Sequence, residues 1–158
     1  MSAVFTPTLE DQPRAEDVAA VRAGLEAYNR RHAPDGSYAP LVIIVRAADQ
    51  SVAGGLVGGT YWGWLHVDTL WLSDEARRQG LGTRMVAMAE DEALRRGCRC
   101  AHLDTMDFQA LPFYQRLGYT VWGELEDLPP GHRRIYLKKE LQTASPELAS
   151  VVRGSLKS

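Results

Sequence analysis

The chain lacks the features that mark several large classes of protein. It has two cysteines among 158 residues, no long uninterrupted apolar run and no excess of basic residues. Without about eighteen consecutive apolar residues, no membrane-spanning helix is expected. The formal net charge of -2 argues against a nucleic-acid partner, because strong phosphate binders carry a basic excess. The first residues are polar and acidic with no apolar segment, so no secretory signal is expected.

The cysteines predict neither a disulfide nor a metal site. Cys98 and Cys100 are separated by one residue, and in an extended segment such neighbours point to opposite faces. A metal site would need His102 and a fourth ligand that the spacing does not supply. We therefore expect structural or incidental cysteines, no metal, and a cytoplasmic location.

The composition that remains is that of an ordinary globular domain. Hydrophobic residues make up 45% and charged residues 24% of the chain. The length suits one domain, which we expect over residues 1–141. The Ser/Ala-rich tail over residues 142–158 is expected to form a marginal helix or to remain disordered.

Apolar periodicity and turn residues predict a mixed α/β fold. The predicted element order is β-α-β-β-β-α-β-α-β-β, with helices on both faces of the sheet. The run Leu41–Val45 is typical of a strand buried on both faces. The predicted strands cover 4–9, 41–45, 51–62, 64–72, 99–106, 119–124 and 133–141, and the predicted helices cover 14–31, 80–96 and 110–117.

The strand 51–62 is unusually rich in glycine. Gly54, Gly55, Gly58 and Gly59 all lie within it. Glycine is costly in a strand, so its presence indicates close backbone approach or strong bending. We interpret the segment as one half of a twisted antiparallel hairpin, with direct contact to a ligand as the alternative.

The segment Leu70–Met85 has the pattern of an anion-binding loop. A strand is followed by glycines at 80 and 82 and at once by a long helix, whose first N–H groups are unpaired and carry partial positive charge. Arg77 and Arg78 add full positive charge. A Walker loop is excluded because its lysine is absent, and the dinucleotide fingerprint fails at Met85.

Two motifs resemble those of the GCN5-related N-acetyltransferases. Arg77-x-x-Gly80-x-Gly82 matches the coenzyme loop of that family, and the strand ending Leu70-Trp71-Leu72 is similar to the family's strand that bends at a bulge. About thirty residues later, Asp107 to Tyr119 resembles the family's Asn-x-x-Ala-x-x-Phe-Tyr-x-x-x-Gly-Phe/Tyr. Segments like Tyr61–Asp68 and Gly123–His132 further resemble small bacterial members of unassigned substrate.

The resemblance implies acetyl-CoA as co-substrate and a mostly antiparallel, twisted sheet splayed between its fourth and fifth strands. The sequence departs from the family's pattern at Asp107, where the family usually has an amide side chain. A carboxylate cannot donate a hydrogen bond to the coenzyme. Pro112 also lies inside the motif and suggests that the helix begins near Leu111. The implied coenzyme contacts are Leu70, Trp71, Leu72, Arg77, Arg78, Gln79, Gly80, Leu81, Gly82, Thr83, Asp107 and Tyr114.

The resemblance also implies a mechanism of direct attack on the thioester by a primary amine. His66 and Asp68 are two residues apart, hence on one strand face, and either is a candidate base acting through water. Tyr114 resembles the family's general acid, and the backbone N–H near Leu72 would polarise the thioester carbonyl. The structural alternative for His66 and Asp68 is a pair that stabilises the sheet.

The acceptor is less well defined by the sequence. An acceptor pocket is expected among the first helix, the hairpin at Trp62 and the loop beginning at Glu124, with Tyr28, Trp62 and Glu124 as candidate contacts. A small molecule or a protein amino group would serve as acceptor, and similar proteins are commonly homodimers. The alternative function is a non-catalytic acyl-CoA-binding sensor or regulatory module.

Overall fold

The structure, a computed structural model, describes residues 4–33 and 36–142, and the tail prediction lies outside them. The chain divides into two compact units, Met1–Gly36 and Ser37–Ser158. In the first unit, the predicted helix is confirmed as α1 (Ala15–His32). The predicted opening strand over 4–9 is wrong, because these residues form no regular structure and Val4 is 90% exposed. A strand needs a hydrogen-bonded neighbour, and Pro7 lacks an N–H with which to build one.

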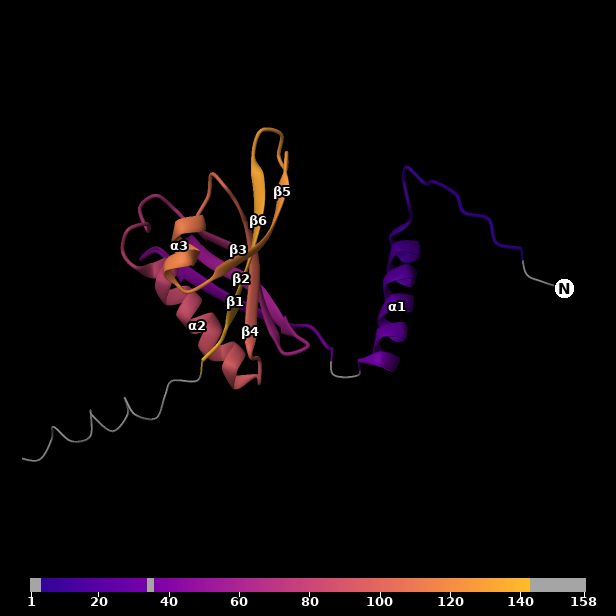
Figure 1. The fold of residues 1–158 in the computed structure, drawn as a ribbon, viewed down its shortest axis with the longest axis horizontal. Helices are drawn as coiled ribbons and strands as arrows, with labels where there is room; N and C mark the ends of the chain where they lie inside the picture. The colour runs from indigo at the N-terminus through magenta and orange to yellow at the C-terminus, as the bar shows by residue number, and fades with distance from the viewer. Residues whose placement is uncertain (1–3, 34–35, 143–158) are drawn as a thin grey trace, which may run out of the picture. The chain divides into compact units, whose positions relative to one another are not determined.

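The second unit is a six-stranded mixed sheet with the order β1-β2-β3-β4-β6-β5 (Figure 1). Only β3 and β4 pair in parallel, and the other neighbours are antiparallel. The predicted mixed α/β fold is therefore confirmed. The strands are β1 (Ala39–Arg46), β2 (Val52–Tyr61), β3 (Trp64–Leu72), β4 (Cys100–Met106), β5 (Thr120–Glu126) and β6 (Arg133–Glu140).

The strand β1 corrects one prediction. Its apolar run was expected to be buried on both faces, but β1 is the outermost strand of the sheet. Leu41 is buried, whereas its neighbour Val42 is 55% exposed, so burial alternates along the strand. A run of β-branched residues indicates a strand but does not say whether that strand is central or at an edge.

Helix α2 (Leu81–Arg95) provides the core beneath one face of the sheet, along which it lies in Figure 1. Its buried residues Met85, Val86, Ala89 and Ala93 recur at helical spacing. They belong to one hydrophobic cluster with inward-facing strand residues, among them Leu65, Val67, Ala101, Leu103, Ile135 and Leu137. This packing fixes the N-terminus of α2 relative to the end of β3, from which the chain enters the helix.

The short helix α3 (Leu111–Arg116) begins where Pro112 predicts. Proline occupies the first helical turn, where the missing N–H costs nothing. Tyr114 is the buried residue of this helix and joins the core cluster under the sheet. The helix therefore holds the aromatic motif next to α2.

The hairpin of β2 and β3 contains a bulge at Asp68. Val57 pairs with Thr69 and Gly58 pairs with Val67, so Asp68 is the extra residue on β3. A Cβ added to Gly58 would lie 2.1 Å from the carbonyl oxygen of His66. Glycine at this position therefore permits the close backbone approach that the bulge requires, as the sequence pattern predicts.

The bulge marks the point where β3 and β4 separate. Their parallel pairing covers only Trp64 to Val67 against Cys100 to Leu103. Beyond it, the remaining residues of β3 pair with β2 alone, and those of β4 pair with β6 alone. The sheet thus opens into a fork, which confirms the predicted splay, now between the third and fourth strands because the opening strand is absent.

Candidate active site

A cavity of about 860 Å³ occupies the fork. Its walls come from the separated part of β3, the loop that leads into α2, the first turn of α2, the end of β4, and α3. The residues that line it are Val67, Asp68, Thr69, Leu70, Trp71, Leu72, Arg77, Arg78, Gly80, Leu81, Gly82, Thr83, Asp104, Thr105, Phe108, Gln109, Ala110, Phe113, Tyr114 and Arg116. The two sequence motifs, far apart in the chain, therefore meet around one space.

Two carboxylates stand where the fork begins. Asp68 and Asp104 each follow the last paired residues of their strands, and both line the cavity. Arg134 neutralises Asp104, with 2.6 Å between Nε and Oδ2. Asp68 is exposed and accepts a hydrogen bond from the Thr69 hydroxyl at 3.1 Å, but pairs with no cation among the described residues. Sequence reasoning missed Asp104, because only the parallel register places it opposite Asp68.

His66 lies next to this point but is not part of the cavity lining. Its ring stacks on His102, with 4.6 Å between centroids and 11° between planes. The Tyr61 hydroxyl and Nε2 of His102 are 2.9 Å apart, which fixes the His102 ring. Burial, and then the neighbouring His66, lower the pKa of His102, while Asp104 partly opposes this. His102 is therefore neutral at neutral pH.

The backbone of β3 presents unpaired groups to the fork. The N–H of Ser73 donates to the Ala53 carbonyl at 2.8 Å, so Ser73 faces β2. Because successive residues of a strand direct their N–H groups to opposite edges, the N–H groups of Leu72 and Leu70 face the fork. A carbonyl oxygen of a bound ligand could accept from them, as the sequence analysis expects near Leu72.

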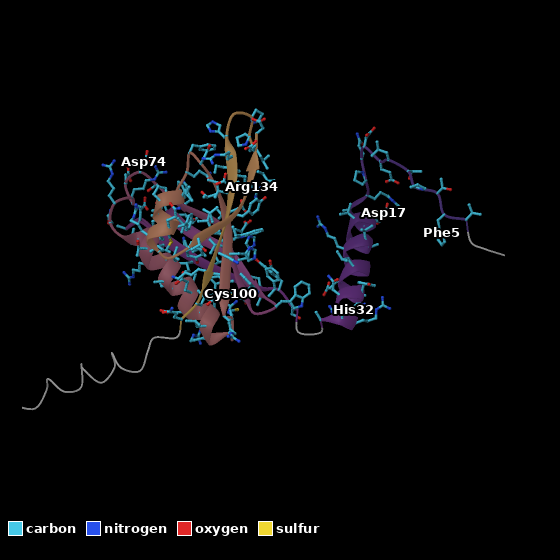
Figure 2. All side chains as sticks on the ribbon, in the orientation of Figure 1. Phe5, Asp17, His32, Asp74, Cys100 and Arg134 are labelled. Carbon is cyan, nitrogen blue, oxygen red and sulfur yellow. The ribbon has the colours of Figure 1, made fainter. Side chains whose placement is uncertain are left out.

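The loop between β3 and α2 carries the two arginines in different environments. Nε of Arg77 donates to the Leu72 carbonyl at 3.0 Å, and its Nη1 pairs with Asp74 at 3.0 Å. Arg77 therefore also shapes the loop. Arg78 lines the cavity and has no partner among the described residues. Figure 2 shows Asp74 at the end of this unit opposite Cys100, where β4 begins.

The first turn of α2 opens into the cavity. Gly80 caps the helix with φ of 72°, a left-handed conformation that favours glycine, and nothing lies within 4 Å of the Cβ that it lacks. The Arg84 N–H is the first to bond within the helix, to the Gly80 carbonyl. The preceding N–H groups thus have no acceptor inside the helix and suit a phosphate.

Gly82 connects the loop to the aromatic motif. A Cβ at Gly82 would lie 3.3 Å from the ring of Phe113. A larger side chain would therefore push Phe113, and with it α3, away from α2. The second glycine of the loop is thus required at least partly for packing, a reason that spacing alone did not reveal.

Tyr114 is 6% exposed and lines the cavity. Its ring packs edge-on against Phe113 and Tyr119, and its hydroxyl has no hydrogen-bond partner in the part of the chain that the structure describes. Burial, and then the negative charge of Asp104, raise the pKa of Tyr114. The phenol is therefore protonated at neutral pH, as a proton donor must be.

Asp107 does not line the cavity. Its carboxylate accepts from the backbone N–H of Arg133 at 3.2 Å and lies 3.1 Å from Nδ1 of His132. The carboxylate thus holds the turn between β5 and β6. Nothing in these contacts supports the coenzyme contact expected at position 107.

The three candidate acceptor contacts do not line the cavity either. Trp62 lies in the β2–β3 turn, whose Gly63 carbonyl accepts from the Arg99 N–H next to the start of β4, away from the fork. Glu124 pairs with Arg133 at 2.9 Å. Tyr28 belongs to the first unit. Their role in acceptor binding stays a prediction.

Potential metal ligands and cysteines do not gather in the described part of the chain. Over residues 4–33 and 36–142, no group of three or more potential metal ligands comes together. Cys98 is buried in the core and Cys100 is half-buried, both as free thiols.

Within residues 4–33 and 36–142, no helix is both long and apolar enough to cross a membrane.

The cavity thus combines an open helix N-terminus with a buried tyrosine and an exposed carboxylate. Residues 7–119 match the model of the acetyltransferase (GNAT) family. The chain belongs to this family, which confirms the resemblance drawn from its two motifs.

Named relatives agree with this assignment. The chain is 42% identical over 131 residues to Acetyltransferase Atu2258 of Agrobacterium fabrum, covering 83% of this chain and 96% of the relative. It is 50% identical over 91 residues to Blasticidin-S acetyltransferase of Streptomyces morookaense, covering 57% and 67%. A crystal structure of an acetyltransferase from Agrobacterium tumefaciens superimposes with a TM-score of 0.80 at 40% identity, covering 86% and 99%. The chain is thus an acetyl-CoA-dependent acetyltransferase.

Proposed function

We propose that the protein transfers the acetyl group of acetyl-CoA to a primary amine of a small basic molecule at the fork. The observation that carries this proposal is that Asp68, Tyr114 and the phosphate-binding end of α2 line one cavity. A proton acceptor, a proton donor and an anion site are thereby available to one bound thioester. An ammonium acceptor first gives one proton to the base, which passes it to water. The neutral amine then attacks the thioester carbon directly, the C–S bond breaks, and the second proton lost from the nitrogen replaces the proton that the general acid gives to the sulfur.

Asp68 is the candidate base that the geometry favours. It lines the cavity and has no cationic partner among the described residues, whereas His66 lies behind it and stacks on His102. An ammonium group that enters the fork meets this carboxylate and gives up a proton to it through water before attack. His66 remains the alternative base.

Tyr114 completes the reaction at the leaving group. Its protonated hydroxyl has no hydrogen-bond partner among the described residues, and it donates to the sulfur as the C–S bond breaks. The N–H groups of Leu72 and Leu70 stabilise the negative charge that develops on the carbonyl oxygen. Arg78 and the first turn of α2 bind the phosphates of the donor.

The acceptor class follows from charge in the cavity. Asp68 has no cationic partner among the described residues, so a cationic acceptor is favoured over a neutral or acidic one. The resemblance to Blasticidin-S acetyltransferase, a protein named for acting on an antibiotic, points to a small molecule. No described residue limits the acceptor to that compound.

An acceptor screen with Asp68→Asn tests the proposal. Thiol release from acetyl-CoA is measured with basic antibiotics, polyamines and peptides, and kcat/KM with the best acceptor is expected to fall about 100-fold in Asp68→Asn. The matched control is Asp91→Asn, a carboxylate on α2 outside the cavity, which keeps wild-type activity. No turnover with any basic small molecule would contradict the acceptor class. Full activity of Asp68→Asn combined with inactive His66→Gln would assign the base to His66.

A further inference from the structure

Gln109 is a cavity residue that neither the sequence motifs nor the mechanism above uses. It lies in the turn between β4 and α3, and it lines the same cavity as Asp68 and Tyr114. Asp107, two residues earlier, forms contacts with the Arg133 N–H and the His132 ring and does not line the cavity. The turn therefore presents position 109, not position 107, to a ligand in the cavity.

The orientation of the Gln109 amide is fixed by its own surroundings. The backbone N–H of Met106 donates to Oε1 at 3.0 Å, and the hydroxyl of the buried Thr105 donates to the same atom at 3.2 Å. Because the Met106 N–H can only donate, the atom that faces it must be the oxygen of the amide. The amide nitrogen of Gln109 is then left with its two hydrogens and no partner among the described residues.

We infer that Nε2 of Gln109 donates a hydrogen bond to an amide carbonyl oxygen of the pantetheine arm of acetyl-CoA. This inference rests on the proposed binding of acetyl-CoA in the fork. Gln109 is exposed, so without a ligand its free donor binds water; because the residue lines the cavity that holds the ligand, a ligand carbonyl can replace that water. The carbonyls of the pantetheine arm are the acceptors that acetyl-CoA offers between its phosphates and its thioester.

The position of Gln109 along the cavity indicates that it faces the pantetheine arm and not the thioester or the phosphates of the coenzyme. The thioester must lie near Asp68 and Tyr114, where the strands separate, and the phosphates lie at Arg78 and the start of α2. Gln109 follows the end of β4 at Met106, past the point of separation. It therefore stands opposite the stretch that the arm must cross.

The test is calorimetric binding to the full chain with Gln109→Glu. This variant keeps one side-chain oxygen for Met106 and Thr105, so the turn keeps its hydrogen bonds, and it replaces the amide donor by an acceptor. Affinity for acetyl-CoA and for CoA is expected to fall about 10-fold or more, since a hydrogen bond is lost and two acceptors face each other. Affinity for 3′-phosphoadenosine 5′-diphosphate, which lacks the arm, is expected to change less than about twofold.

A control variant makes the result specific. Gln115→Glu introduces the same charge on α3 outside the cavity lining and is expected to bind acetyl-CoA as the wild type does. Unchanged acetyl-CoA affinity in Gln109→Glu, an equal loss with the nucleotide fragment, or a loss confined to acetyl-CoA would each overturn the assignment. Failure of the wild-type chain to bind acetyl-CoA would instead contradict the proposed function.

Discussion

The side chains of the fork differ in environment, and the differences decide their chemistry. Among the described residues, buried Tyr114 has no hydrogen-bond partner and exposed Asp68 has no cationic partner, whereas Asp104 is neutralised by Arg134. Burial keeps the phenol protonated, while exposure keeps Asp68 accessible to an acceptor. In the proposed mechanism, the difference in burial lets Tyr114 serve as proton donor and Asp68 as proton acceptor at one site.

Removing the Tyr114 hydroxyl tests the donor role at this scale. Tyr114→Phe is expected to lower kcat about 100-fold and to change acetyl-CoA affinity less than about twofold, because the hydroxyl acts on the leaving thiolate. The raised pKa of Tyr114 further predicts that wild-type turnover does not fall between about pH 8 and 10 through loss of its proton. Stopped-flow thiol release and calorimetry measure the two effects.

Tyr136→Phe is the matched control for this prediction. Tyr136 lies on β6 and does not line the cavity, so its variant is expected to turn over at the wild-type rate. Wild-type kcat in Tyr114→Phe would remove Tyr114 from proton transfer. A large loss of coenzyme affinity in that variant would assign it a binding role instead.

At the scale of elements, the bulge in β3 sets the site. It forms because Asp68 is an extra residue opposite Gly58, and the paired region of β3 and β4 ends at the residue before it. The strand therefore bends where the fork opens, and the carboxylate of Asp68 is placed at that bend. This geometry requires glycine at position 58 of β2, because a Cβ there would overlap the His66 carbonyl.

Gly58→Ala tests this account. The added methyl group has no room against the backbone, so the free energy of unfolding is expected to fall by about 2 kcal/mol or more, and kcat is expected to fall with it. Gly123→Ala is the control within the same sheet, because nothing lies within 4 Å of its Cβ. That variant is expected to change stability by about 0.5 kcal/mol or less. Urea unfolding measures both, and equal stabilities would show that the bulge tolerates a side chain.

The sequence predicted most strands of the sheet but not which strands lie next to one another in it. Strands and helices from residue 39 onward follow their predicted ranges closely, because glycine, proline and apolar periodicity mark their ends. Val4 to Leu9 and β1 were misjudged for one reason: strand pairing is a long-range property that a local pattern does not carry. Asp104 was missed because its role depends on the register between β3 and β4.

At the scale of the whole molecule, basic and acidic side chains lie on different elements around the cavity, although the net charge is small. Arg77 and Arg78 line the cavity from the loop that leads into α2, Arg116 lines it from α3, and Asp68 and Asp104 line it where the strands separate. A formal net charge of -2 does not reveal this separation. The two sequence motifs predicted most of the residues that line the cavity near the first turn of α2, since each motif keeps its spacing on one loop or helix start, but Gln79 and Asp107 do not line it. The end where the strands separate is built from β3 and β4, so its composition follows only from the fold.

The most direct measurement of the central claim is acetyl-CoA binding by Arg78→Glu. Arg78 lines the cavity and has no protein partner in the described part of the chain, so its reversal removes a charge-assisted contact without breaking one inside the fold. Calorimetry is expected to show affinity reduced about 10-fold or more, with Arg95→Glu at the far end of α2 binding as the wild type does. Equal affinity in Arg78→Glu and the wild type would contradict the placement of the coenzyme phosphates at this loop.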